Sequence, residues 1–199
     1  MPNKKNKVKF NICNVHYAPI TAAEDGTVTF AAPVAMPGAV SISMDPTGEP
    51  ESFYADGVEY YVINNNQGYD GDLELAMIPE SFRTDILKEE ADSNQVLVEN
   101  ANSETGSFAL LFEFDGDIRK IRHVLYNCSA SRPSIESKTN EEDKEVQTET
   151  LTVKARPLAN GYVKAKTGDS TTETVYNNWY KSVYEPNAEV QTALAGTGE

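Results

Sequence analysis

The residues of this sequence that could bind a transition metal or act as nucleophiles are few and far apart. Cys13 and Cys128 are its only cysteines, and His16 and His123 are its only histidines. The sequence has no CxxC pair, and a metal cluster would normally show closer spacing of its ligands. We therefore expect no metal centre. A disulfide between Cys13 and Cys128 stays open, although nothing in the sequence indicates an oxidising compartment.

A cluster of oxygen-bearing side chains between residues 64 and 72 could bind a hard cation. It consists of Asn64, Asn65, Asn66, Asp70 and Asp72. Calcium prefers such oxygen ligands, but the spacing does not fit an EF-hand loop and the closing glutamate is missing. The sequence therefore disfavours a calcium site.

Catalysis by a histidine is a further chemical reading, and the sequence argues against it. His123 lies within a predicted strand, where a packed structural imidazole is favoured over a general base. The chain contains no GxSxG, GxGxxG, P-loop or HExxH motif, which would accompany a nucleophile, a nucleotide or a zinc ion. We expect neither enzymatic activity nor a cofactor.

The charge of the chain disfavours two further classes of function. Of its 199 residues, 31 are acidic and 17 are basic, which gives a net charge of −14. A protein that grips nucleic acid or docks on an anionic membrane needs surface lysine and arginine, so both roles are disfavoured. Residues 45–104 hold fifteen acids against only Arg83 and Lys88. This local excess serves either solubility or a specific function.

Two segments raise the question of a membrane or of export. Residues 26–44 carry no charge, but Pro33, Pro37 and several hydroxyl residues rule against a spanning helix. The N-terminal lysines are not followed by an apolar stretch, so we expect no signal peptide.

The elements that must position these residues are mostly strands. Apolar and polar residues alternate with a period of two along several segments, which is typical of half-buried strands. Asp56-Gly57 and Asp115-Gly116 lie at predicted hairpin turns, because such pairs tolerate tight turn geometry. We expect strands at 7–12, 52–54, 58–62, 72–77, within a hairpin over 107–126, at 148–156 and at 162–166. The predicted fold class is mainly β.

A helix is predicted at about 79–90, flanking the strands. It begins with Pro79, whose missing N–H is tolerated at the first helical position. Ile78, Phe82 and Ile86 are four residues apart and form one apolar stripe. We expect this stripe to pack on the β-structure.

A second helix is predicted near the C-terminus, at about 171–185. The pattern Ser170-x-x-Glu173 predicts a capping box at its start, and Pro186 ends it. Its aromatic stripe is more typical of packing than of a ligand site and comprises Val175, Tyr176, Trp179, Tyr180, Val183 and Tyr184.

These elements predict one β domain with a C-terminal appendage. The β domain covers residues 1–170, and the helix at 171–186 packs on it. The polar run 134–145 is predicted to be a solvated loop, and residues 187–199 a flexible tail.

Five short blocks of the sequence match a known family in the order in which they occur. They are Tyr54–Tyr60, Gly71–Glu80, Phe108–Asp117 followed by Arg122–Cys128, Thr148–Leu151 and Trp179–Tyr184. Together they span most of residues 8–185. On these blocks the chain resembles the major tail protein family of long-tailed phages that infect Gram-positive bacteria.

The resemblance implies a β-sandwich-like or barrel-like tail tube fold and a structural role in the virion. Such subunits form hexameric rings that stack into a hollow tube, through which phage DNA passes without specific binding. The implied partners are further copies of the chain and the tape measure, tail terminator and baseplate proteins. The protein would be present in the host cytoplasm during assembly and in the phage tail afterwards, with no catalytic residue, no cofactor and no membrane contact.

The resemblance suggests a use for the acidic middle segment. A ring of carboxylates repels phosphate at short range, whereas a ring of lysines would bind it. We hypothesise that acids of this segment line the lumen of the tube, the candidates being Glu49, Glu51, Glu59, Asp70, Asp72 and Glu74. The alternative is that most of these acids lie on the outer wall.

Three other functions stay open. A tail terminator or connector-type protein would share the fold but form a single ring. A monomeric β-sandwich carbohydrate-binding module would use Trp179 and exposed tyrosines, and a hydrolase would depend on His123. The lysine-rich N-terminal stretch is either an ordered strand extension or a free arm that orders on assembly.

Overall fold

The computed structural model describes residues 5–23, 27–139 and 145–186, and every structural statement below refers to these residues. Strands account for 47% of the described residues and pair in antiparallel fashion, which confirms the mainly β prediction. The strands are β1 (Lys9–Ala22), β2 (Val28–Phe30), β3 (Val34–Ala35), β4 (Ala39–Thr47), β5 (Glu51–Ala55), β6 (Val58–Ile63), β7 (Gly68–Leu75), β8 (Glu90–Ala91), β9 (Leu97–Val98), β10 (Phe108–Gly116), β11 (Ile121–Ala130), β12 (Glu149–Arg156) and β13 (Lys164–Lys166). Two short helices are α1 (Glu80–Asp85) and α2 (Glu173–Asn178).

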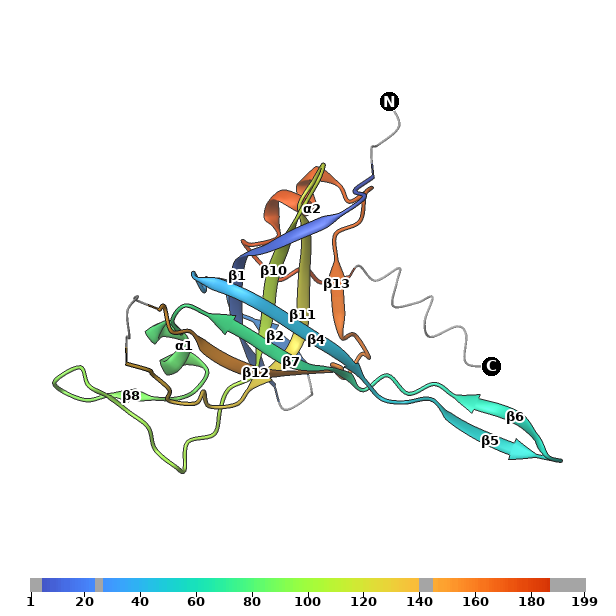
Figure 1. The fold of residues 1–199 in the computed structure, drawn as a ribbon, viewed down its shortest axis with the longest axis horizontal. Coiled ribbons are helices and arrows are strands. Elements are labelled where there is room, and N and C mark those ends of the chain that lie inside the picture. The colour runs from blue at the N-terminus through green and yellow to red at the C-terminus, as the bar shows by residue number, and fades with distance from the viewer. Residues whose placement is uncertain (1–4, 24–26, 140–144, 187–199) are drawn as a thin grey trace.

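Most of the strands belong to one curled sheet (Figure 1). It runs in the order β2-β1-β10-β11-β12-β7-β4, and β3 and β13 pair with β1 and β11 outside this path. Although β4 is the last strand of the order, it packs against β1 without pairing with it. The sheet therefore folds over on itself around a core, as the sandwich-like or barrel-like prediction requires.

Two clusters of apolar side chains, one on each face of β10, hold the fold together. Phe108, Leu110 and Phe112 belong to the larger core, which β1, β7, β11, β12 and α1 also line. The alternate residues Ala109 and Leu111 belong to a second cluster, which the C-terminal segment covers. Because side chains alternate between the faces of a strand, β10 is buried on both of them.

Both predicted hairpins are present. β5 and β6 are joined by Asp56-Gly57, whose φ angles of 53° and 77° suit a two-residue turn that follows the strand twist. This hairpin extends away from the curled sheet (Figure 1). The hairpin predicted over 107–126 is formed by β10 and β11, and β11 continues to Ala130. The turn predicted at Asp115-Gly116 is wrong, because both residues belong to β10 and pair with the start of β1, and the chain turns at 117–120.

The first strand is present, but its predicted burial is wrong at the beginning. The alternation at 7–12 predicts a half-buried strand, yet Val8 and Phe10 are 50% and 55% exposed. Burial begins only at Val15, because the start of β1 pairs with the end of β10 beyond the core. The positive φ angles of Asn11 and Asn14 mark two irregularities that also interrupt the alternation.

The first helix is shorter than the predicted range of 79–90. Lys88 has a φ angle of 61°, a left-handed conformation that a right-handed helix cannot contain, so the helix stops before it. The apolar stripe is nevertheless confirmed, because Ile78, Phe82 and Ile86 are all buried in the larger core.

The second helix is likewise shorter than its predicted range of 171–185. Its N-cap is Thr172, with no side-chain hydrogen bond to the helix, so the capping box predicted at Ser170 is wrong. After α2 the chain turns, and Trp179 and Val183 are buried in the second cluster. The predicted packing role of the aromatic stripe is therefore confirmed without a continuous helix.

The described residues include part of the predicted polar loop and none of the predicted tail. Residues 131–139 and 145–148 contain no regular secondary structure, in agreement with the loop predicted at 134–145. The rest of that loop, 140–144, and the predicted tail, 187–199, lie outside the described residues.

Within the described residues, the two cysteines are unpaired and the uncharged segment forms strands. Cys13 and Cys128 are both free thiols. Burial raises the pKa of Cys128 to about 12, so its thiol is protonated and inert at neutral pH. Residues 27–44 form β2, β3 and part of β4, and no described helix is long and apolar enough to cross a membrane.

His123 is a packed residue of β11. Its ring is stacked on Phe112, with the centroids 5.1 Å apart and the planes 2° apart, and it meets Phe114 edge-on at 5.2 Å. Burial lowers its pKa to about 4, and nearby lysines add to the shift. The folded protein therefore holds this imidazole in its neutral form.

Replacing Phe82 tests the attachment of α1 to the core. Its ring makes edge contacts with Tyr17 and Phe108, at centroid distances of 5.1 and 5.2 Å. We expect Phe82→Ala to lower the free energy of unfolding by about 3–5 kcal/mol, because it leaves a cavity among these rings. Urea denaturation measures the change. Glu80→Ala, on the exposed side of α1, is the matched control and should cost less than about 1 kcal/mol.

The neutral His123 predicts a loss of stability in mild acid. Above the ordinary pKa of 6.5 the imidazole is neutral in both the folded and the unfolded chain, so it has no effect. Between pH 6.5 and pH 4 the unfolded chain binds a proton that the folded chain does not, so stability falls with pH. At pH 5 this penalty is about 2 kcal/mol.

His123→Phe keeps an aromatic ring against Phe112 and removes the titration. We expect the difference in unfolding free energy between pH 7 and pH 5 to be smaller in His123→Phe than in the unchanged protein by about 2 kcal/mol. His16→Phe, which removes the other imidazole, is the control. The assignment is wrong if His16→Phe relieves the acid sensitivity and His123→Phe does not.

Candidate functional surfaces

Three of the six acids predicted to line a lumen lie on one face of the sheet. Asp70, Asp72 and Glu74 alternate along β7 with the buried Leu73 and Leu75. Because successive side chains of a strand point to opposite faces, the three carboxylates share the outward face.

The neighbouring strands make this outward face polar. The strand register places three residues of β4 and three of β12 beside the acids of β7: Ser41, Ser43, Asp45, Thr150, Thr152 and Lys154. We call the outward residues of β4, β7 and β12 the acidic face. Its bases, Lys154 and Arg156, lie at the Asp70 end, whereas Asp72 and Glu74 are flanked by hydroxyl groups.

Hydrogen bonds and an ion pair hold two of these acids in the charged form. The hydroxyls of Thr148 and Ser41 donate to Glu74 at 2.7 and 2.8 Å, and they lower the pKa of that carboxyl. The Arg156 guanidinium is bonded to Asp70 and lowers the pKa of that carboxyl as well. Both groups therefore carry their negative charge well below neutral pH.

The other three predicted acids lie elsewhere. Glu51 belongs to β5 and Glu59 to β6, and Glu49 lies in the connection that leads to this hairpin. The hairpin projects from the curled sheet (Figure 1), so these acids do not join the row on β7. The structure thus brings three of the six candidates together and separates the rest.

The same hairpin exposes an apolar surface that the sequence did not predict. Phe53 lies opposite Tyr61, and Val58 and Ile63 follow on the same face. Phe53 and Tyr61 are 59% and 64% exposed, so no described element covers them. We call these four residues the hairpin surface. The overlooked signal is the consecutive aromatics at 53–54 and 60–61, since a strand with one buried face would alternate.

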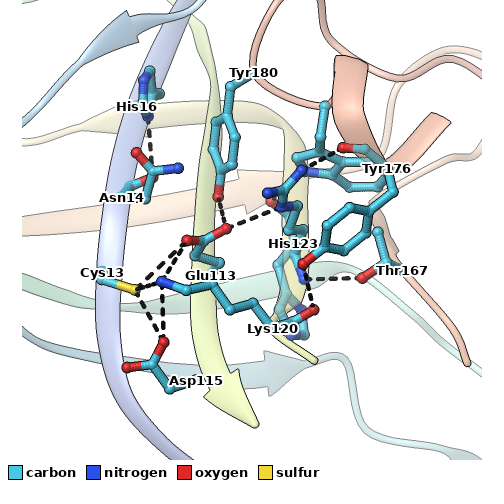
Figure 2. A network of polar contacts seen from close by, with 12 residues as sticks. Cys13, Asn14, His16, Glu113, Asp115, Lys120, His123, Thr167, Tyr176 and Tyr180 are labelled. Atoms are coloured by element: carbon cyan, nitrogen blue, oxygen red, sulfur yellow. Dashed lines mark hydrogen bonds and ion pairs between the residues drawn. The ribbon is translucent and has the colours of Figure 1, made fainter. Parts of the chain in front are cut away.

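A buried carboxylate, Glu113, joins β10 to the C-terminal segment (Figure 2). Its side chain is 4% exposed, and its oxygens lie 3.0 Å from Lys120 Nζ and 3.0 Å from Arg122 Nε. The hydroxyl of Tyr180 donates to it at 3.3 Å. Bonds to Glu113 and to Asp115 raise the pKa of Lys120, so the cation is held in place. A buried charge is tolerated only with such partners.

Arg122 extends this network to α2. Its guanidinium lies 3.8 Å from the ring centroid of Tyr176 and also donates a hydrogen bond to the carbonyl oxygen of Tyr176. Arg119 lies 3.6 Å from that ring as well. Further along, the Tyr126 hydroxyl donates to the carbonyl of Tyr184 at 2.9 Å. The C-terminal segment is therefore attached to β10 and β11 along its length.

The burial of Glu113 does not follow from the strand pattern alone. The alternation of Phe108, Leu110, Phe112 and Phe114 assigns Glu113 to the outward face of β10. That assignment is correct, but the C-terminal segment covers this outward face too. The signal was the presence of Ala109 and Leu111 at alternate positions, which makes the second face apolar.

The geometry around the histidines and Cys13 is not that of a catalytic site. His123 is held neutral in an aromatic setting, and His16 Nδ1 lies 3.0 Å from the carbonyl oxygen of Asn14. Burial raises the pKa of the Cys13 thiol, although Lys120 Nζ lies 3.3 Å from its sulfur. A nucleophilic cysteine needs the opposite shift.

The oxygen cluster weighed as a calcium site is dispersed in the structure. Residues 64–66 lie in the connection between β6 and β7. Asp70 is engaged by Arg156, and Asp72 accepts a hydrogen bond from Thr152 at 2.8 Å. Among the described residues, no three acidic, histidine or cysteine side chains come together to hold a metal ion.

Comparison with known proteins identifies the family. A family model described as phage tail tube protein matches residues 4–194, which is nearly the whole chain. No curated protein gives a significant match. The family match covers the blocks on which the resemblance to phage major tail proteins was recognised, and the mainly β fold accords with it. The chain therefore belongs to the phage tail tube protein family, whose members are structural, non-enzymatic components of the phage tail.

Proposed function

We propose that this chain is the major subunit of a phage tail tube, that its copies form stacked hexameric rings, and that the acidic face lines the lumen through which DNA passes. The acidic face carries the proposal. It is an uncovered sheet face with a row of three carboxylates on a single strand. Membership of the tail tube family supports self-assembly with other tail proteins.

The chemistry of the acidic face suits a conduit for a polyanion. Asp72 and Glu74 are surrounded by serine and threonine, which give DNA phosphates no cationic partner. In a ring, each carboxylate would recur in every copy, and the summed field would repel phosphate within the Debye length. DNA would then slide past the wall without being held by it.

The edge of the sheet supports closure into a ring. β4 is the last strand of the sheet order and pairs only with β7 among the described strands. An unpaired strand edge is a template for another chain. Pairing with a neighbouring copy would satisfy it and would continue the acidic face from one subunit to the next.

Tape measure, tail terminator and baseplate proteins would be the partners of such a tube. A single-ring terminator or connector is the second candidate, because it would share the same fold. A carbohydrate-binding module is disfavoured by Trp179, which is 2% exposed and therefore cannot stack on a sugar.

Electron microscopy of the purified full chain over a range of concentrations tests the proposed function. We expect long hollow tubes of constant diameter with six-fold symmetry in cross-section. Single rings at every concentration would instead assign the chain to the terminator or connector type. Chains that remain monomeric in analytical ultracentrifugation would contradict both assignments.

Asp72→Lys tests the lumen assignment. We expect the variant to form tubes of unchanged diameter, because Asp72 is exposed and outward on β7. A ring of lysines should bind DNA, so short duplexes should sediment with the variant tubes at low salt and be released steeply as salt rises. Tubes of the unchanged protein should leave the DNA in solution.

Glu104→Lys is the matched control, since it makes the same charge change at an exposed position outside the acidic face. Tubes of this control should bind little DNA. If both variants bind the same amount, or if neither binds any, Asp72 does not face the lumen.

A further inference from the structure

A cavity of about 340 Å³ opens beside β4, β11 and β13. Its wall is largely apolar and aromatic, with Met44, Tyr69, Phe112, Phe114 and the stacked His123 among its lining residues. A concave apolar site of this size can accommodate a large side chain from another molecule.

Lysines surround this cavity. Lys9 Nζ lies 4.8 Å from the ring centroid of Phe114, and Lys164 Nζ lies 4.2 Å from that of Tyr69, with both lysines in the lining. Lys166 is close enough to contribute to the lowered pKa of His123. In the described part of the chain, no carboxylate lies within ion-pair distance of these three lysines. We call them the cavity lysines.

Three like charges close to an apolar recess favour a partner that is both acidic and apolar. The β5–β6 hairpin has this composition. Residues 51–63 contain three acids, Glu51, Asp56 and Glu59, and no base. The hairpin surface adds the exposed rings of Phe53 and Tyr61.

The hairpin does not fill the cavity of its own chain. It extends away from the curled sheet, and its large apolar side chains are exposed (Figure 1). A two-stranded hairpin is only marginally stable in water by itself. Exposed apolar patches of this kind mark interaction sites. We therefore expect the hairpin to bind a site on another molecule.

We infer that the β5–β6 hairpin of one copy docks on the lysine-rimmed cavity of a neighbouring copy. The hairpin surface covers the aromatic wall, and Glu51, which pairs with Ile63 on the same face, lies beside the cavity lysines. Glu59 pairs with Tyr54 on the opposite face and adds to the negative charge of the hairpin as a whole. This inference rests on the proposed function, since it requires copies of the chain to assemble. It adds which two surfaces meet and why they recognise each other.

Charge reversal on either side should break the contact. The cavity variant carries Lys9→Glu, Lys164→Glu and Lys166→Glu, and the hairpin variant carries Glu51→Lys and Glu59→Lys. All five side chains are exposed, so the fold should be retained, and circular dichroism and thermal unfolding check this. Asp56 is left unchanged because it has a φ angle of 53° in the turn.

The readout is the critical concentration for tube formation, measured by sedimentation and electron microscopy. Each variant alone should raise it at least about tenfold, because the hairpin and the cavity rim then carry charge of the same sign. The combined five-site variant, in which both partners have changed sign, should return to within about threefold of the unchanged protein. A mixture of the two variants should also assemble, since each supplies the surface that the other needs.

A pair of Glu→Lys changes at Glu90 and Glu104, away from both surfaces, is the control for net charge and should leave the critical concentration nearly unchanged. If the unchanged protein forms tubes and both variants assemble as it does, the inference is overturned while the proposed function stands. The same holds if the folded combined variant fails to recover. If the unchanged protein stays monomeric, both fail.

Discussion

The two-residue period of β7 and β12 is the constraint on which the rest of the structure depends. Leu73, Leu75, Leu151 and Val153 must enter the core, so the residues between them must face outward. A slip of one residue in the pairing would bury the carboxylates of β7 and expose its leucines. The acidic face is therefore a direct consequence of core packing, and the core specifies the wall of the proposed conduit.

The second dependence runs through Glu113. Its carboxylate is buried between β10 and the C-terminal segment, where Lys120, Arg122 and Tyr180 compensate it. Loss of one partner would leave a buried charge uncompensated, so the segment can pack in only one position at low cost. The buried apolar contacts of Trp179 attach the C-terminal segment to β10, while the ion pairs of Glu113 fix the position in which the segment packs. Together they turn β10 into a strand with no free face.

Features that depend on neighbours along the chain were predictable, and features that depend on distant segments were not. The Asp56-Gly57 turn and the stripe of Phe82 follow from local rules and are present in the structure. The ends of both helices were missed, because the backbone at Lys88 and the packing of Trp179 override helical propensity. The exposure of the hairpin surface was also missed. The periodicity of a strand shows that a face is apolar, but it does not show whether that face is buried in its own chain or left exposed.

The acids of the β5–β6 hairpin have a consequence for the architecture of the assembly. Two such hairpins, brought together, would bring two segments of net negative charge close to each other, since each carries Glu51, Asp56 and Glu59 and no base. This repulsion disfavours the symmetric pairing that would close a dimer and end growth. Because the hairpin repels a second hairpin but fits the cavity of another copy, the copies are joined head to tail. Each addition then leaves one hairpin and one cavity still open, so the assembly has a direction and its two extremities differ chemically.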